Sequence, residues 1–310
     1  MDLLDSLVTS KAPSLGIPLA EQLRPKVLSD VVGQTHLVGP GMPLRLAVEQ
    51  GHLHSMILWG PPGVGKTTLA SILAQAVHAH FVSLSAVHAG VKELRVVFEE
   101  AAFLAAHQNQ QTVLLIDEIH RFSKAQQDVI LPEVELGRVT LIGATTENPS
   151  FSLNNALLSR TLVYVLKPLS LTELNTLLIQ TLARLESPLK FSSAQQAWLT
   201  EKADGDARRL LTLLERLLEY IKTQPTEILE DAVFYALLQS QPQRFDQKGD
   251  LFYEQLSAFH KSVRGSSPDG ALYWMARFIT AGGDPRHLIR RLTAIASEDI
   301  GNADPRALEI

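Results

Sequence analysis

The stretch GPPGVGKTT, residues 60 to 68, determines how the rest of the sequence is interpreted. It fits the pattern G-x4-G-K-[S/T], a glycine-rich loop whose successive backbone N–H groups point at phosphate oxygens. A β-rich run, Ser55–Trp59, precedes the loop and a helical pattern, Thr67–His78, follows it. Because a phosphate loop requires this context, the sequence predicts a phosphate-binding loop between a strand and a helix.

Each part of this loop has a predicted role in binding a nucleoside triphosphate. Lys66 is expected to reach the β- and γ-phosphates, and the Thr67 hydroxyl is expected to ligate Mg²⁺. The amino terminus of the following helix adds the positive end of its dipole. The predicted nucleotide-binding residues of the loop are Gly60, Pro61, Pro62, Gly63, Val64, Gly65, Lys66, Thr67 and Thr68. The predicted cofactors are therefore ATP and Mg²⁺.

Short β-rich runs alternate with helical patterns, such as Lys92–His107, up to Pro168. The runs are Ser55–Trp59, Phe81–Ser85, Val113–Ile116, Val139–Gly143 and Thr161–Val165. Near-continuous apolar strands separated by helices are typical of a parallel sheet covered on both faces. After Pro168 the patterns are amphipathic helices, over Ser170–Leu185, Ser192–Lys202, Asp206–Lys222 and Thr226–Leu238. The predicted fold class is α/β, a parallel phosphate-loop sheet flanked by helices, followed by a small helical lid and an all-helical C-terminal region.

These patterns predict five segments along the chain. Residues 1–17 are a loose N-terminal segment, 18–168 an α/β nucleotide-binding core and 169–239 a helical lid. Residues 240–250 belong to a polar stretch with a Pro and a Gly, which is typical of a linker. Residues 251–310 form the helical C-terminal region.

The composition excludes several other classes of protein. The chain has 310 residues, a net charge of −5 and no cysteine, so it has no disulfide and no thiolate metal site. DNA contacts would have to come from local basic patches rather than from a basic tail. No apolar run approaches the roughly 20 residues of a membrane span, and the N-terminus lacks the pattern of a signal peptide. The expected location is cytoplasmic, associated with the nucleoid, with no membrane partner.

The stretch VLLIDEIHRF, residues 113 to 122, is an apolar run that ends in two carboxylates. At a strand end beside the phosphate loop, Asp117 is expected to hold Mg²⁺ and Glu118 to orient and polarise the attacking water. Asp-Glu-x-His is also a helicase signature, but such a helicase needs a second sheet domain, and this chain continues as helices. His120 is therefore interpreted as part of a loop under the strand end, in which Phe122 packs.

Three polar residues farther along the chain are candidates for contacts with a γ-phosphate. Thr146 is expected between Glu118 and the γ-phosphate, the alternative being a Thr that caps a turn. Arg160 faces away from its own nucleotide and is either a solvated residue or a finger that reaches a neighbouring subunit. In GDARR, Arg208 is favoured over Arg209 for a contact from the lid.

The motifs GPPGVGKTT, LLIDE, GATT, LLSR and GDARR together resemble those of AAA+ ATPases, and most closely the clamp-loader-like branch. In that branch a segment similar to residues 18–39, PLAEQLRPKVLSDVVGQTHLVG, lines the adenine pocket. The resemblance implies that the residues near the base are Leu19, Arg24, Pro25, Val32 and Gln34. It also adds weight to Arg160 as an arginine finger.

Two motifs of the tail, HKSVRG and SEDIGNADPRAL, resemble the replication-associated recombination protein A family, also called MgsA, and the Werner-helicase-interacting ATPases. The resemblance implies an ATPase that acts on DNA at stalled or damaged replication forks and is stimulated by single-stranded or gapped DNA. Its implied partners are replication proteins such as single-strand binding protein or a clamp loader. Members of the family continue beyond these motifs into a region used to form homo-oligomers, so residues 251–310 are expected to be an incomplete oligomerisation module.

Two other functions remain open at this stage. A clamp-loader-like scaffold would bind ATP to recruit replication partners with little hydrolysis, and it would need neither Glu118 nor Arg160. A branch-migration motor of the Holliday-junction type would carry a winged-helix domain after the lid, whereas this tail has only helical patterns.

The resemblance also implies where DNA would bind. In related clamp loaders the loop and helix after the second strand face DNA, which corresponds here to Gly90, Lys92 and Arg95. Gly90 would allow close approach of a phosphate, and the two cations would offset its charge. An ordinary solvated helix start is the alternative. Lys261 and Arg264 in the tail are further candidates, while the tail arginines have acidic residues such as Asp299 as alternative partners.

Overall fold

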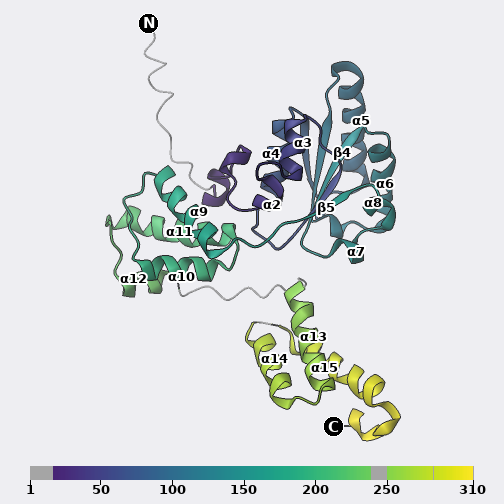
Figure 1. Ribbon diagram of the computed structural model, residues 1–310, viewed down its shortest axis with the longest axis vertical. Helices are drawn as coiled ribbons and strands as arrows, with labels where there is room; N and C mark the ends of the chain where they lie inside the picture. The colour runs from purple at the N-terminus through teal and green to yellow at the C-terminus, as the bar shows by residue number, and fades with distance from the viewer. Residues whose placement is uncertain (1–16, 239–249, 282, 310) are drawn as a thin grey trace. The chain divides into compact units, whose positions relative to one another are not determined.

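The computed structural model describes residues 17–238, 250–281 and 283–309 (Figure 1). The chain divides into two compact units. The first comprises the described residues up to Gly51 together with Pro62–Val77 and Lys167–Leu238, and the second comprises His52–Pro61, His78–Leu166 and the described C-terminal residues. Apart from Ile17 and Asp250, the predicted loose segment and linker lie outside the described residues.

The second unit contains a five-stranded parallel sheet. Its strands are β1 (Met56–Trp59), β2 (His80–Ser85), β3 (Thr112–Asp117), β4 (Val139–Thr145) and β5 (Leu162–Val165). They lie in the order β2-β3-β4-β1-β5, and each neighbouring pair is parallel. The predicted fold class is confirmed, and each predicted strand is present with its ends displaced by at most two residues.

The strands are apolar because both faces of an inner parallel strand are covered. All seven residues of β4 are buried, whereas β5 forms an edge of the sheet and exposes several side chains. Three helices, α5 (Val91–Gln108), α6 (Lys124–Glu135) and α8 (Asn155–Leu158), lie on one side of the sheet (Figure 1). They share one core cluster with the strands, which includes Leu94, Phe98, Leu114, Ile116, Ile130 and Leu157.

Helix α6 is an element that the hydrophobic pattern did not reveal. Half of its residues are polar, it contains Pro132, and its first turn is fixed by a capping box between Ser123 and Gln126. The fully buried Gln127 donates to the carbonyl oxygens of Phe122 and Ser152 and accepts from the N–H of Asn154. The helix is therefore held by hydrogen bonds to distant loops, which a periodicity of apolar residues does not record.

The first unit is helical. Its helices in the N-terminal part are α1 (Leu19–Gln22), η1 (Leu28–Asp30), α2 (Thr35–Val38), α3 (Pro43–Glu49) and α4 (Lys66–Ala76). Four more correspond to the predicted lid, α9 (Leu171–Arg184), α10 (Ser193–Ala203), α11 (Ala207–Thr223) and α12 (Asp231–Leu238). The predicted capping box between Ser170 and Glu173 is present. The prediction that the last helix starts at Thr226 was wrong, because the chain is extended where Ile228 bridges Lys190.

An aromatic cluster holds the lid helices together. Phe234 of α12 is fully buried and makes edge contacts with Phe191, Trp198 and Tyr235. Helix α11 contributes the largest apolar face, with Leu210, Leu211, Leu213, Leu214 and Leu217 buried. The lid thus has a core of its own, and it does not depend on the sheet for burial of these side chains.

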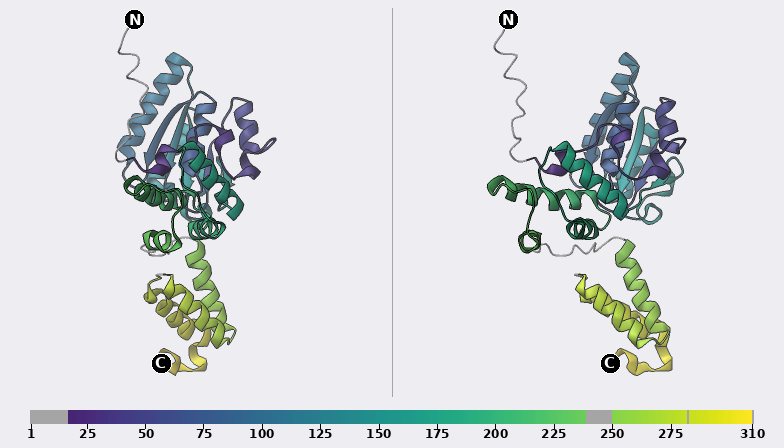
Figure 2. Two further views of the ribbon diagram at one scale, coloured as in Figure 1. Left: turned by 90° about the vertical axis from the view of Figure 1, so that its left-hand side faces the viewer. Right: turned by 60° about the vertical axis from the view of Figure 1, so that its left-hand side comes forward.

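The C-terminal part consists of helices joined by short turns over its described residues, 250–281 and 283–309. Its elements are α13 (Asp250–Arg264), α14 (Pro268–Thr280), α15 (Pro285–Ala294), the π-helical turn η3 (Ile295–Ile300), η4 (Gly301–Ala303) and η5 (Pro305–Leu308). Helices α13 and α14 lie side by side (Figure 2), with Phe259 and Phe278 among the buried side chains. These residues contain no strand, so they form no β-wing. None of the helices that the structure describes is both long and apolar enough to cross a membrane.

Replacing Phe234 by Ala is expected to lower the free energy of unfolding of the lid by about 3–5 kcal/mol, because it empties the centre of the aromatic cluster. Ile179→Ala, at a lid position with 54% of the side chain exposed, should change it by no more than about 0.5 kcal/mol. Chemical denaturation followed by tryptophan fluorescence tests this difference, since Trp198 belongs to the same cluster. Equal effects of the two substitutions would contradict this description of the lid core.

Candidate active site

The glycine-rich loop, Gly60–Gly65, connects β1 to α4. Gly60 extends β1 between its two neighbours: its N–H donates to the Thr145 carbonyl oxygen at 3.2 Å, and a Cβ atom would lie 2.4 Å from the carbonyl oxygen of Leu166. Gly65 precedes α4 with a φ of +95°. No side chain caps α4, whereas Ser or Asp caps each of α9, α10 and α11. A helix that begins at a glycine, with no capping side chain before it, suits the binding of a phosphate.

Gly63 is the point where the lid meets the loop. It has a φ of +72°, and a Cβ atom there would lie 1.7 Å from Oδ1 of Asp206. The N–H of Ala207 donates to the Gly63 carbonyl oxygen at 3.1 Å. Asp206 also caps α11 by accepting from the N–H of Arg209 at 2.9 Å. The first turn of α11, with the exposed Arg208, therefore begins against the phosphate loop.

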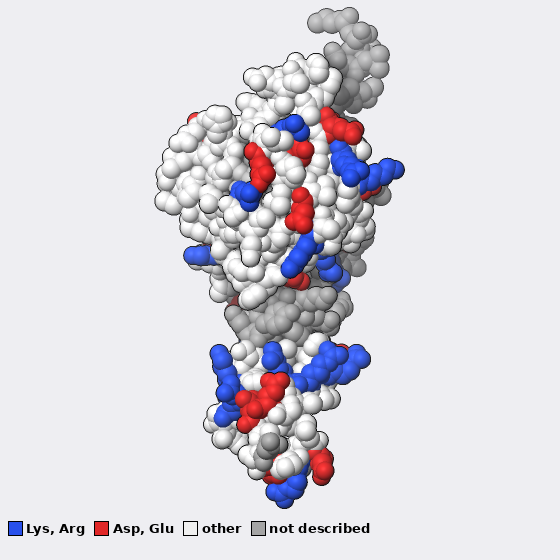
Figure 3. Space-filling view, turned by 90° about the vertical axis from the view of Figure 1, so that its right-hand side faces the viewer, with Lys and Arg blue, Asp and Glu red and all other residues white. Residues whose placement is uncertain are grey.

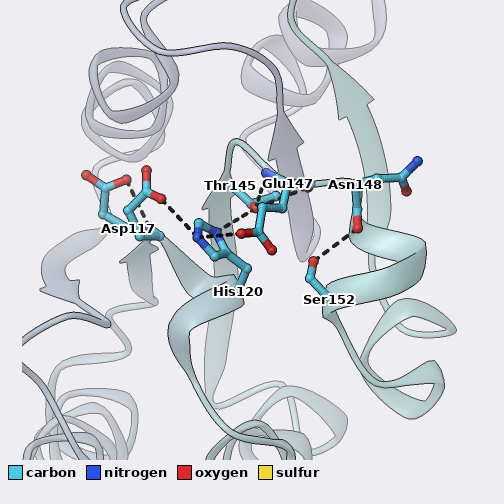
Figure 4. Close-up of polar contacts among 7 residues, drawn as sticks. Asp117, His120, Thr145, Glu147, Asn148 and Ser152 are labelled. Atoms are coloured by element: carbon cyan, nitrogen blue, oxygen red, sulfur yellow. Dashed lines mark hydrogen bonds and ion pairs between the residues drawn. The ribbon is translucent and has the colours of Figure 1, made fainter. Parts of the chain in front are cut away.

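Asp117 is the last residue of β3 (Figure 4), and Glu118 comes directly after it, so both carboxylates lie at the carboxyl end of the strand. Glu118 has a φ of +54°, a left-handed conformation that costs a non-glycine residue about 1–2 kcal/mol. Its N–H donates to Oδ1 of Asp117 at 3.1 Å. The reversal at Glu118 turns the chain into the short helix η2 (Ile119–Arg121), and Phe122 is buried after it, as predicted.

His120 lies at the centre of the polar contacts in this region (Figure 4). Its side chain is only 4% exposed, and its Nδ1 is 3.0 Å from Oγ1 of Thr145. Its Nε2 is 3.3 Å from Oε2 of Glu118 and 3.7 Å from Oε1 of Glu147. His120 thus lies in the turn after β3, as interpreted, but the sequence did not predict its contacts with Thr145, Glu118 and Glu147. The Asp-Glu-x-His pattern, first considered as a helicase signature, was the feature of the sequence that drew attention to His120.

The end of β4 and the loop after it supply the other half of this cluster. Thr145 is fully buried, and its hydroxyl accepts from the N–H of Glu147 at 3.0 Å. The predicted residue, Thr146, follows β4 directly and is half-buried. Asn148 then caps α7 (Pro149–Ser152) by accepting from the N–H of Ser150 at 3.0 Å. Sequence reasoning singled out Thr146 and missed Thr145 and Glu147, whose partners are distant in the sequence.

Arg160 follows α8 on the side of the sheet that carries α6. Its Nη2 is 2.5 Å from Oε1 of Glu135, and both side chains are largely exposed. Its Nη1 also donates to the carbonyl oxygen of Ala156 at 2.9 Å. Arg160 is thus a surface residue with an acidic partner in its own chain.

The segment predicted to line an adenine pocket contacts the lid helices and Lys167, which precedes the lid. Leu19 is buried in the lid core, and its N–H donates to Glu215 at 2.8 Å. The buried side-chain amide of Gln34 pairs with both backbone groups of Lys167, donating to the carbonyl at 2.7 Å and accepting from the N–H at 3.0 Å. Arg24 pairs with Glu21. The positions of Pro25 and Val32 are half-buried.

Four of the residues predicted to face DNA are exposed and Gly90 is half-buried, but some of the five already have partners. The N–H of Gly90 donates to the Glu93 carboxylate at 2.8 Å. The backbone N–H groups of Glu93 and Gly90 hold the pKa of the Glu93 carboxyl below its ordinary value. Lys92, Arg95 and Lys261 are exposed. Arg264 pairs with Asp299 at 3.2 Å, the alternative that the sequence left open.

The parallel sheet, the phosphate loop, the paired carboxylates and the helical lid define an AAA+ ATPase. The family model described as ATPase family associated with various cellular activities matches residues 56–169. Two further models match the rest, the AAA C-terminal domain over residues 185–264 and the MgsA AAA+ ATPase C terminal over residues 265–310. Binding of a nucleotide follows from membership of this class.

Curated relatives give the family within this class. Replication-associated recombination protein A of Coxiella burnetii is 51% identical over 95% of this chain and 68% of its own length. The Escherichia coli K12 protein of the same name is 48% identical over 94% of this chain and 67% of its length. The chain belongs to the replication-associated recombination protein A family, as the sequence motifs indicated. ATPase WRNIP1 of Dictyostelium discoideum is 41% identical over 94% of this chain and 36% of its length.

A solved structure with the same fold is that of Thermotoga maritima RuvB, described as a Holliday junction branch migration motor. It is 25% identical, with a TM-score of 0.58, and the match covers 78% of this chain and 80% of that one.

Gly63→Ala is expected to weaken binding of a non-hydrolysable ATP analogue by about tenfold or more, because the new methyl group overlaps Asp206 and displaces the start of α11. Gly51→Ala is the matched control: Gly51 has a φ of +71° but open space around it, so it shares only the backbone cost of about 1–2 kcal/mol. Calorimetric titration measures both affinities. Equal affinities of the two variants would show that the contact between Gly63 and Asp206 is unimportant for nucleotide binding.

Proposed function

We propose that this ATPase acts on DNA at stalled or damaged replication forks and that single-stranded or gapped DNA stimulates its hydrolysis of ATP. The observation that carries the proposal is the cluster of Asp117, Glu118 and the loop after β4 at one edge of the sheet. The relatives named replication-associated recombination protein A support a role in replication and recombination. The likeness to a branch migration motor supports an action on DNA.

The residues of the site are assigned by their chemistry. The backbone of the loop binds the phosphates, and Lys66 neutralises the charge on the β- and γ-phosphates. Asp117 and the Thr67 hydroxyl fit Mg²⁺, which takes one or two protein oxygens and is otherwise held by phosphates and water. Glu118 orients the water that attacks the γ-phosphorus and takes up its proton. The bond to the β–γ bridging oxygen then breaks, and ADP and phosphate leave.

Four further assignments complete the proposed site. Thr146 contacts the γ-phosphate from the loop after β4, and Arg208 contacts it from the first turn of α11. Arg160 acts on the nucleotide of a neighbouring subunit in a homo-oligomer, which requires it to leave Glu135. The base lies near the segment that contains Leu19, Arg24, Pro25, Val32 and Gln34, of which Leu19 and Gln34 act by fixing that segment to the lid and to Lys167.

DNA is the proposed macromolecular partner, together with replication proteins such as single-strand binding protein or a clamp loader, in the nucleoid of the cytoplasm. Acidic and basic side chains are interspersed on the face in Figure 3, so a few phosphate contacts account for binding better than one large basic surface. Gly90, Lys92 and Arg95 at the start of α5 are the proposed contacts, with Lys261 and Arg264 in the tail. Phosphate binding at Gly90 requires displacement of Glu93.

A scaffold that binds ATP without hydrolysing it is less well supported than an active ATPase. Glu118 is held in a left-handed conformation, and strain of this kind persists where the surrounding contacts impose it, commonly at active sites. A binding module has no need for a carboxylate at this position. The rate of ATP turnover with and without a forked DNA distinguishes the two functions.

Lys66→Ala is expected to abolish ATP turnover by weakening binding of the phosphates. Glu118→Gln keeps the shape of the side chain but removes the carboxylate that polarises water, so ATP should stay bound while kcat falls by about 10² or more. Steady-state turnover and nucleotide retained on a filter measure the two effects. If Glu118→Gln turns over ATP at the wild-type rate, the proposed role of Glu118 is wrong.

A double variant with Lys92→Ala and Arg95→Ala is expected to need more single-stranded DNA for half-maximal stimulation of ATP turnover. The slope of log affinity against log salt should fall by roughly one for each lost phosphate contact. The matched control removes two charges that are paired elsewhere, by Arg138→Ala and Lys190→Ala. Identical salt slopes for the two double variants would place the DNA on another surface.

A further inference from the structure

His120 is much more deeply buried than the two carboxylates that it meets. Its side chain is 4% exposed, while those of Glu118 and Glu147 are each 34% exposed. The neighbours of His120 in the chain, Ile119 and Phe122, are buried in the core cluster between the sheet and its helices. The imidazole is therefore fixed by packing, and the two carboxylates that it meets are within reach of solvent.

We propose that His120 is a positioning residue for ATP hydrolysis, which holds the carboxylate of Glu118 in the direction of the attacking water. This inference rests on the role of Glu118 proposed above. It also goes beyond that role, because it assigns the orientation of Glu118 to a side chain that does not itself reach the nucleotide. Burial of the ring makes His120 a group that acts through Glu118 and not a base for the water.

The contacts fix which hydrogen atoms the ring carries. Nε2 faces Oε2 of Glu118 at 3.3 Å and Oε1 of Glu147 at 3.7 Å, and carboxylate oxygens only accept hydrogen bonds. Nε2 therefore carries the hydrogen. The Thr145 hydroxyl, 3.0 Å from Nδ1 and 3.2 Å from the Glu147 carbonyl oxygen, donates its one hydrogen either to a neutral ring or to that carbonyl, and in the second case it accepts from a protonated ring. In either state both ring nitrogens have partners, and the ring plane is fixed.

Nε2 of His120 lies beside two carboxylates, 3.3 Å from Oε2 of Glu118 and 3.7 Å from Oε1 of Glu147. Glu118 comes after β3 and Glu147 after β4, and without the imidazole N–H beside them the two carboxylates would repel each other in a partly buried setting. The N–H of Glu147 donates to the Thr145 hydroxyl, which closes a ring of contacts through His120. The loop that carries Thr146 and the turn that carries Glu118 are thereby joined at one imidazole.

Replacing His120 by Gln or by Asn distinguishes the role of Nε2 from that of Nδ1. The Nε2 of Gln reaches about as far as the Nε2 of His, whereas the amide of Asn reaches only as far as Nδ1. His120→Gln is therefore expected to keep kcat for ATP within about threefold of the wild-type value, and His120→Asn and His120→Ala are expected to lower it by about tenfold or more. KM for ATP should change by less than about twofold in all three, because the phosphate loop is untouched.

The control is His80→Ala, which removes another imidazole–carboxylate pair, with Glu100 at 3.4 Å, on β2 of the same sheet. It should leave kcat and KM at the wild-type values. Thermal unfolding and binding of an ATP analogue are measured for each variant. If His120→Ala does not fold, the comparison of His120→Gln with His120→Asn still tests the positioning role of His120.

Two results would overturn the inference. One is a kcat of His120→Ala or His120→Asn within about twofold of wild type, and the other is an equal loss in His120→Gln and His120→Asn. Glu118→Gln is assayed beside these variants. If it loses turnover while His120→Asn keeps it, only the positioning role fails, and if Glu118→Gln keeps turnover, the proposed role of Glu118 fails first.

Discussion

All five strands of the sheet are parallel, and the position of every polar residue at its edge depends on that constraint. Parallel strands must be joined by long crossovers, so that all their carboxyl ends lie at one edge of the sheet. Because β4 lies between β3 and β1, Thr145 stands between the strand that ends in Asp117 and the strand that leads into the phosphate loop. The sheet thus brings together, at one edge, polar residues that are far apart in the sequence.

Residues with left-handed backbone conformations then set the direction of the chain at this edge and at its contacts with the lid. Gly63 adopts its conformation freely, and the absence of a side chain admits Asp206 of the lid. Glu118 and Gln34 adopt similar conformations at a cost, which contacts elsewhere must offset. For Glu118 these contacts are to the side chains of Asp117 and His120, and for Gln34 they are to the backbone of Lys167. Local strain and long-range polar contacts are therefore two parts of one arrangement.

The sequence predicted those elements whose pattern lies within their own residues. Most of the strands are near-continuous apolar runs, the phosphate loop is a spacing of glycines before a lysine, and α9 and α11 of the lid are strongly amphipathic. Helix α6 was missed because half of its residues are polar, it contains Pro132 and it is anchored through Gln127. The contacts of His120 were missed because Thr145 is 25 residues away in the chain. Gln34 was predicted near a base, and its amide partner lies 133 residues away. Such pairs exist only once the sheet has formed.

A crystal structure of this chain with ADP, Mg²⁺ and aluminium fluoride, a mimic of the transferring phosphoryl group, tests the central claim most directly. We expect a water molecule between the mimic and Glu118, within the roughly 2.6–3.2 Å of a hydrogen bond from its carboxylate, with His120 still in contact with that carboxylate. A water held by another side chain, with Glu118 turned away from the mimic, would contradict the account.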